Sequence, residues 1–151
     1  MSLEIISFLV GLIGVLFVIY PRFSVSPGTP LDVNNPFKTP FMVKNDGYLP
    51  IFNVKYALTA ERMELVNGTT FTNCGGSTGN TIEKLSINKS STFFIDRIFS
   101  MHPNLVKSAV IFISVTYRPF LVPFAFTENV RFKAEINAKK EYVWFEYYDK
   151  Q

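Results

Sequence analysis

Hydrophobic positions divide the chain into two parts. Residues 3–20 are apolar almost without a break, and Glu4 is the only charged residue among them. After Tyr20 there is no helical periodicity. Short runs of β-branched and aromatic residues instead alternate with Gly, Pro, Asn and Asp, which is typical of strands joined by turns. The pattern predicts an N-terminal helix followed by an all-β domain.

The N-terminal segment has the length and composition of a membrane anchor. Its 18 residues would form a helix of about 27 Å, close to the roughly 30 Å of a bilayer's hydrocarbon core. A buried soluble helix would rarely sit at the N-terminus and end at Pro21-Arg22. A cleaved signal peptide is the other alternative, but no Lys or Arg precedes the apolar run, and Pro27 follows the best cleavage match. We therefore expect a retained single-pass transmembrane helix over residues 1–21.

The remainder, residues 22–151, has enough strand signals for a two-layer domain. Phe52, Val54, Tyr56 and Leu58 recur at every second position and are expected on one face. The expected strands cover residues 22–26, 39–44, 52–59, 82–87, 92–99, 109–117, 126–136 and 142–147, with 69–73 as a further candidate. Residues 26–36 and 74–81 are expected to be a turn-rich connection and a flexible loop. Seven or eight strands predict an immunoglobulin-like antiparallel β-sandwich.

Two stretches carry a family resemblance. The segment PFMVKNDGYLPIFNVKYALTAE is similar to the second and third strands of bacterial CARDB-like and other immunoglobulin-like domains, and LSINKSSTFFID resembles their later hairpin. The pattern also resembles the water-stress domains of late-embryogenesis-abundant proteins, although the Asn35-Pro36 pair precedes the strand where that family would place it. The resemblance implies a sandwich used for binding or structure rather than catalysis.

The composition of the chain argues against most classes of catalytic site. The chain has 151 residues, a formal charge of +3, one Cys and one His. Cys74 has no partner for a disulfide, and Cys74 with His102 does not complete a zinc site or a catalytic triad. No spacing brings Glu61, Glu64 and Glu83 together for acid–base work. The scattered charges form no nucleic-acid patch. We expect no enzymatic activity, no cofactor, no metal and no nucleic-acid partner.

Two loop segments carry oxygen ligands of the kind that calcium prefers, residues 32–35 and 45–47. Turn chemistry explains both sequences without a metal. In the second segment, Asp46 is expected to accept backbone hydrogen bonds and Gly47 to adopt a positive φ.

Two segments are rich in aromatic residues. Residues 142–148 could form an exposed interface, but we favour a final strand that packs Trp144 into the core or caps a sheet edge. Residues 118–126 join two strands and should form a surface loop, yet they are almost wholly apolar. The alternative for this second segment is an irregular edge strand folded back onto the core.

The expected topology makes residues 118–126 part of a candidate site. In an immunoglobulin-like sandwich the turn between strands two and three, here 47–51, lies at the end where the first strand starts. The connection between strands six and seven, here 119–124, lies there too. We predict a membrane-proximal interaction patch made of Tyr48, Leu49, Phe120, Leu121, Val122 and Phe124. Arg22 and Arg118 are predicted to contact headgroup phosphates. The alternative is that both loops fold inward and bury each other.

These features predict a non-catalytic, membrane-anchored interaction or assembly module, an accessory subunit of a membrane complex. Its partners would be the lipid bilayer and other membrane subunits. A lipid- or glycan-binding receptor domain is the alternative. Arg22 and Lys38 follow the anchor and would favour a cytoplasmic domain, but long domains translocate largely regardless of charge. We expect the domain on the extracytoplasmic side of the cell membrane, which is periplasmic in a Gram-negative cell.

Overall fold

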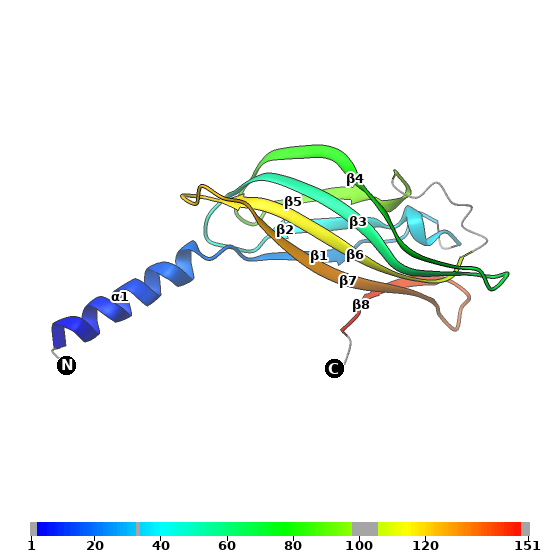
Figure 1. Cartoon of the computed structure of the whole chain (residues 1–151), viewed down its shortest axis with the longest axis horizontal. Coiled ribbons are helices and arrows are strands. Elements are labelled where there is room, and N and C mark those ends of the chain that lie inside the picture. Colours follow the sequence, from blue (N-terminus) through cyan, green and yellow to red (C-terminus); the bar gives the residue numbers. More distant parts are fainter. Residues whose placement is uncertain (1–2, 33, 98–105, 149–151) are drawn as a thin grey trace.

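The computed structural model describes residues 3–32, 34–97 and 106–148. Within them the chain forms one α-helix, two 3₁₀ turns and eight strands (Figure 1). The helix is α1 (Leu3–Ile19), and the 3₁₀ turns are Pro36–Lys38 and Ile95–Arg97. The strands are β1 (Phe23–Pro27), β2 (Pro40–Asn45), β3 (Ile51–Leu65), β4 (Thr70–Leu85), β5 (Ser90–Phe94), β6 (Val106–Pro119), β7 (Phe126–Ile136) and β8 (Tyr142–Glu146).

The strands form two antiparallel sheets that pack face to face. The smaller sheet has the order β1-β2-β5 and the larger β4-β3-β6-β7-β8. At one lateral edge of the sandwich β4 lies against β5, and at the other β8 lies against β1. The prediction of an all-β antiparallel sandwich is confirmed.

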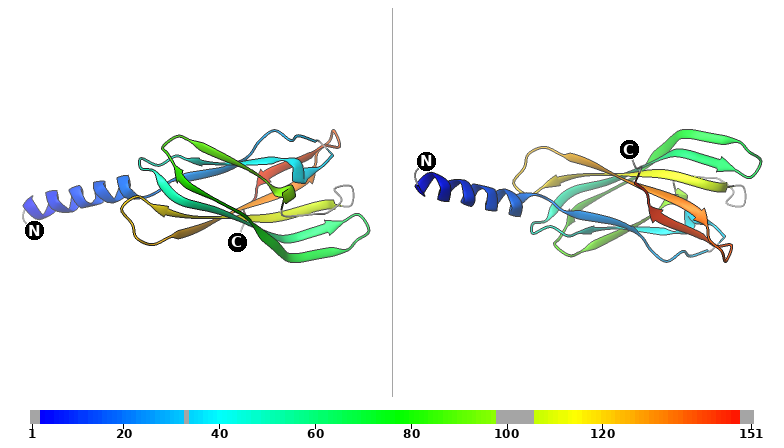
Figure 2. Two further views of the ribbon diagram at one scale, coloured as in Figure 1. Left: turned by 90° about the horizontal axis from the view of Figure 1, so that it is seen from above. Right: turned by 90° about the horizontal axis from the view of Figure 1, so that it is seen from below.

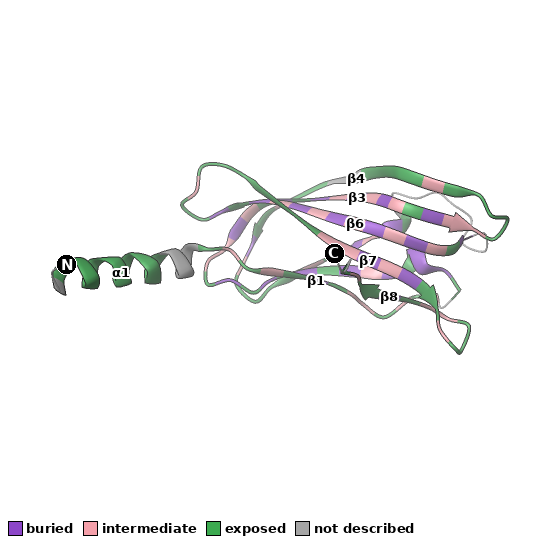
Figure 3. Ribbon diagram, turned by 60° about the horizontal axis from the view of Figure 1, so that its bottom comes forward, coloured by how far each residue is buried: buried purple, intermediate pink, exposed green. Residues whose placement is uncertain are grey.

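Buried residues alternate with more exposed ones along the central strands (Figure 3), and the buried side chains form the hydrophobic core. At the centre, the Phe41 ring packs edge-on against Phe132 and Trp144, with ring centroids 5.0 and 5.7 Å apart. Trp144 is 5% exposed, and its Nε1 donates a hydrogen bond to the Pro36 carbonyl oxygen at 2.8 Å. The final strand therefore places Trp144 in the core, as predicted.

Strand β4 corrects one expectation. The candidate strand at 69–73 and the strand at 82–87 belong to one long strand, and the flexible loop expected at 74–81 is wrong. Gly75 explains the difference, because a Cβ there would lie 2.2 Å from the Leu58 carbonyl oxygen of β3. Glycine lets the two backbones approach closely, so main-chain pairing extends the strand through a segment with few apolar side chains.

Strand β5 is shorter than expected. The predicted strand at 92–99 ends at Phe94, where the 3₁₀ turn Ile95–Arg97 begins. Residues 98 and 99 lie outside the described residues, as does His102.

Helix α1 projects from one end of the sandwich (Figure 1). Its side chains are exposed at every position from 4 to 15, and Phe8 and Val10 are 69% and 64% exposed. Among the described residues, no helix combines the length and apolarity needed to cross a membrane. The prediction of a transmembrane helix is corrected to a helix of 17 residues. It stops at Ile19 because Pro21 disfavours a helical conformation for Tyr20.

Candidate functional site

The fold brings two connections to the end of the sandwich where α1 meets β1 (Figure 2). One is the β2–β3 connection, residues 46–50, and the other is the β6–β7 connection, residues 120–125. They emerge beside each other because Ile51 pairs with Pro119 and Phe52 with Arg118 across β3 and β6. We call these two connections, with Arg22, Phe52 and Arg118, the helix-proximal tip.

Most of the predicted patch is exposed at this tip. Tyr48, Leu121 and Phe124 are 61%, 73% and 61% exposed, and Phe120 is exposed as well. Leu49 and Val122 are half-buried. The two connections therefore do not bury each other, and the β6–β7 connection is a surface loop rather than an edge strand. The role of the patch stays a prediction.

Leu121 has an unusual backbone for its residue type. Its φ is +68°, in the left-handed region, and the N–H of Val122 donates to the Pro119 carbonyl oxygen at 3.3 Å to close the turn. Glycine or asparagine would adopt this conformation at lower cost, since Cβ disfavours it by about 1–2 kcal/mol. An exposed leucine at such a position does not serve the fold. Leu121 is therefore a candidate for contact with a partner or a membrane.

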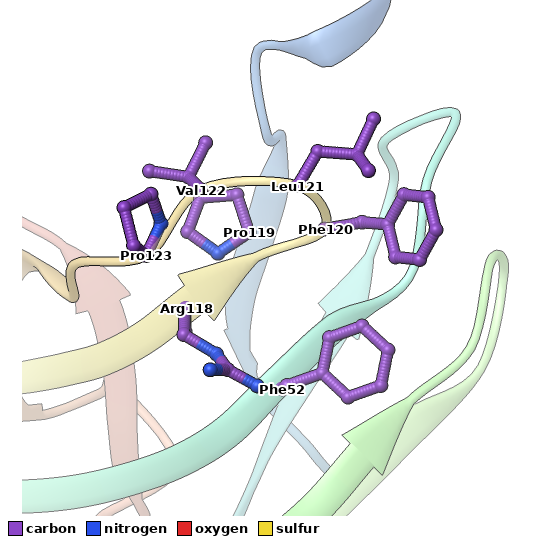
Figure 4. A pocket seen from close by; sticks show the side chains of 7 residues that line it. All are labelled: Phe52, Arg118, Pro119, Phe120, Leu121, Val122 and Pro123. Carbon is purple, nitrogen blue, oxygen red and sulfur yellow. The ribbon is translucent and has the colours of Figure 1, made fainter.

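A hollow of about 520 Å³ opens beside this loop (Figure 4). The Phe120 and Phe52 rings flank it, with centroids 6.2 Å apart. The Arg118 guanidinium carbon lies 6.0 Å from the centre of the Phe52 ring. The hollow therefore combines apolar walls with one cation.

The second arginine of the tip is arranged in a similar way. The Arg22 guanidinium carbon lies 5.9 Å from the centre of the Tyr48 ring. Arg22 and Arg118 both reach the surface, and neither forms a salt bridge within the described residues. Stacking on rings holds both cations at the surface, where they can meet an anionic partner.

Asn45 supports the tip from within. It is fully buried, its side-chain amide donates to the Leu49 carbonyl oxygen at 2.9 Å, and its Oδ1 accepts from the Gly47 N–H at 3.0 Å. The N–H of Asp46 donates to the Arg22 carbonyl oxygen at 2.9 Å, which ties the β2–β3 connection to the start of β1. Hydrogen bonds therefore hold the β2–β3 connection of the tip in place.

Two expectations for this turn are wrong. Gly47 has no positive φ; a Cβ there would lie 3.1 Å from the Arg22 nitrogen, so a larger residue would crowd the start of β1. The Asp46 carboxylate accepts from the Ser24 hydroxyl and pairs with the Lys44 ammonium, at 2.5 and 2.6 Å, rather than accepting backbone hydrogen bonds. These contacts lower the pKa of Asp46, Lys44 contributing most. The backbone acceptor of the turn is Asn45.

The other oxygen-rich segment also serves a turn. Asp32 Oδ1 accepts from the Asn34 N–H, and Asn35 Oδ1 accepts from the Phe37 N–H, each at 3.0 Å. The Asp32 carboxylate lies 3.7 Å from the Lys38 ammonium. These oxygens are engaged by the chain itself.

The three glutamates that were considered for acid–base work lie outside the helix-proximal tip. Glu61 forms a two-pronged ion pair with Arg131, and its Oε2 accepts from the guanidinium Nε at 2.6 Å. Glu64 pairs with Lys107 at 2.7 Å. Glu83 lies on β4. Glu61 and Glu64 line one hollow of about 360 Å³, and each is engaged there by a cation.

Sequence reasoning missed Phe52 as a wall of the hollow. It was expected on the same face as Val54, but it is half-exposed, and Ile51 takes the buried position. A register shift between Phe52 and Lys55, with Asn53 at φ +52°, turns the start of β3. An asparagine in an apolar alternation is the signal that could have indicated this bulge.

The sequence matches no family model and no curated protein. Among solved structures, the X-ray structure of Northeast Structural Genomics Consortium target SoR45 is similar at 11% identity, with a TM-score of 0.39 over 90% of this chain and 98% of that one. A likeness of this degree carries no functional argument, so the function is inferred from the residues of this chain.

Proposed function

We propose that this chain is a non-catalytic, membrane-attached interaction module that serves as an accessory subunit of a membrane complex. One observation carries the proposal: an apolar helix, exposed at each position from 4 to 15, leads directly into a tip that again exposes large apolar side chains. Apolar surface of this extent is covered by a membrane or a partner in most proteins. Helix α1 would be embedded in the bilayer, and the tip would face its surface.

The chemistry of the tip supports a lipid surface in particular. Leu121 and Phe124 would enter the apolar part of the interface, while Arg22 and Arg118 would contact anionic headgroups. The order of the two sheets supports an immunoglobulin-like sandwich, a scaffold suited to binding. We place this domain on the extracytoplasmic side of the cell membrane, because domains of this character are commoner outside the cytoplasm.

The orientation is tested with the full chain in liposomes, on a Cys74→Ser background. A fluorophore is attached at Leu121→Cys in one sample and at Val66→Cys in the other. Val66 is 67% exposed in the β3–β4 turn at the opposite end. Lipids brominated on the acyl chain should quench the label at 121 and leave the label at 66 unaffected. Equal quenching, or extraction of the chain by alkaline carbonate, would contradict the proposal.

The role as a subunit is tested by purification from gently solubilised membranes. The double variant Leu121→Ser/Phe124→Ser should lose the subunits that co-purify with the natural chain. The matched control is Leu31→Ser/Val66→Ser, which alters two similarly exposed apolar residues away from the tip. Loss of the same subunits from both variants would count against the tip as the contact.

A lipid-binding receptor domain is the second candidate. The hollow beside Arg118 favours it, because apolar walls and one cation suit a single anionic lipid. Native mass spectrometry separates the two functions: a stoichiometric lipid that Arg118→Gln removes supports the receptor, and a co-purifying subunit without lipid supports the assembly module.

A further inference from the structure

The lateral seam between β4 and β5 has features that the membrane-facing tip does not explain. Each of these strands is the outer strand of its sheet, and the two lie against each other along one side of the sandwich. The hollow at this seam is lined by none of the residues of the tip, so a contact there should leave the membrane attachment unchanged.

Among the described strands, only β2 pairs with β5, so the outer edge of β5 can accept a further strand. The N–H of Asn45 donates to the Lys89 carbonyl oxygen at 3.0 Å, which fixes which residues of β5 bond to β2. Antiparallel hydrogen bonds alternate along a strand, so Ser91 and Phe93 also bond to β2. The backbone groups of Ser90 and Thr92 therefore point away from the sheet. Such groups are complementary to one chemistry, an extended polypeptide backbone.

A hollow of about 180 Å³ lies directly inside this edge. Its walls come from β3, β4 and β5 and include Tyr56, Asn80, Ile82, Ser91 and Phe93. Tyr56 and Phe93 stack with ring centroids 4.5 Å apart and form its apolar floor. For scale, a dry cavity of about 150 Å³ accommodates benzene. The hollow thus has room for one leucine or phenylalanine side chain.

Tyr56 is unsatisfied within this hollow. The residue is 4% exposed, and its hydroxyl forms no hydrogen bond of good geometry among the described atoms, although the Ser91 hydroxyl lies close enough to affect its pKa. Burial raises the pKa of the phenol, and a hydrogen-bonding contact with the Ser91 hydroxyl lowers it in part. A buried donor without an acceptor costs free energy and calls for an explanation. An acceptor from a bound molecule would remove the cost.

We infer that the β4–β5 seam binds an extended segment of a partner protein, which adds as a strand to β5, inserts one apolar side chain into the hollow and offers a carbonyl oxygen to Tyr56. Pairing with β5 of a second copy would not fill the hollow with Phe93, because that side chain is buried in the copy's own core. The inference names the partner contact of the proposed assembly module. It rests on the interaction role proposed above and not on the membrane attachment.

The probes are short capped peptides of alternating Thr and Val with Leu, Phe or Asp at the centre, added to the full chain in detergent micelles. The Leu or Phe peptide should bind and slow amide hydrogen exchange at Ser90 and Thr92. The Asp peptide should not bind, because a carboxylate cannot enter the apolar hollow unpaired. Equal binding of the Asp peptide, protection at β1 or β8 instead, or no binding by any peptide would overturn the inference.

Two variants separate a binding role from a structural one. Tyr56→Phe should weaken peptide binding by about tenfold, the size expected for one hydrogen bond, while the melting temperature stays the same or rises. A fall in melting temperature with unchanged peptide binding would show a purely structural hydroxyl and overturn the inference. Thr92→Pro removes an outward N–H and should abolish exchange protection in a folded chain. Liposome attachment should be unaffected by either variant, which distinguishes failure of this inference from failure of the membrane proposal.

Discussion

Asn45 joins the two sheets: its side-chain amide, on β2 of the small sheet, donates to the carbonyl oxygen of Leu85, on β4 of the large one, at 3.0 Å. Together with its bonds to Leu49 and Gly47, this makes one buried side chain the partner of three backbone groups. It fixes the end of the sandwich from which the exposed apolar loops emerge.

Asn45→Ala should therefore be strongly destabilising. We expect a loss of about 2–4 kcal/mol in the free energy of unfolding, because three backbone groups lose their partner. Urea denaturation followed by the fluorescence of Trp144, the single tryptophan, measures it. Asn129→Ala, at an exposed position on β7, is the control and should change stability by under about 0.5 kcal/mol. Equal losses in the two variants would contradict the role of Asn45.

In contrast to Asn45→Ala, the substitution Leu121→Asn should stabilise the fold. Asparagine tolerates the left-handed conformation at this position better than leucine, so the free energy of unfolding should rise by up to about 1 kcal/mol. The same change at the half-buried neighbour, Val122→Asn, should lower it. Thermal unfolding of both variants tests this. A loss of several kcal/mol for Leu121→Asn would show that the leucine belongs to the core.

Substitutions at two adjacent residues of β4 should change the stability of the fold by very different amounts. Cys74 is exposed, and Cys74→Ser should change stability by under about 1 kcal/mol. Gly75→Ala would place a Cβ 2.2 Å from the Leu58 carbonyl oxygen, so β3 and β4 must separate locally. We expect a loss of about 3 kcal/mol or more, as for other severe steric conflicts. Similar unfolding curves for the two variants would rule out close backbone contact at Gly75.

The Asp46 carboxylate should give a small, pH-dependent contribution to stability. Its pKa in the fold is lowered from 3.8 by Lys44 first and Ser24 second. A group with a lowered pKa stabilises the fold above its unfolded pKa, and the effect disappears as the pH falls through the folded value. The difference between the natural chain and Asp46→Asn should be under about 1 kcal/mol, because the pair is exposed, and should shrink below about pH 4. A difference that grows on acidification would contradict this sign.

The fragment 22–151 should fold without α1. The side chains described for residues 4–15 of the helix are all exposed, so its removal takes nothing from the core. Circular dichroism should show a β-rich domain with cooperative unfolding that a chelator leaves unchanged. A helix-dominated spectrum, or unfolding on chelation, would show that the domain depends on α1 or on a metal.

The sequence by itself determined the elements whose signals are local. The strand at 126–136 and the strands near 22–26 and 39–44 follow from alternating apolar residues between turn residues. The apolar character of residues 119–124 and the place of this segment at the helix-proximal end also followed, because strand order fixes which connections share an end of a sandwich.

Tertiary structure decided the rest. The Gly-rich half of β4 is a strand only because β3 offers a backbone at contact distance, and nothing within residues 74–81 signals that partner. Phe52 leaves the core because of a bulge against β6, and Asn45 acquires its role from a carbonyl 40 residues away. These features arise from contacts between distant parts of the chain. A local pattern of apolar and polar residues predicts which side chains are buried, but not which backbone groups they contact.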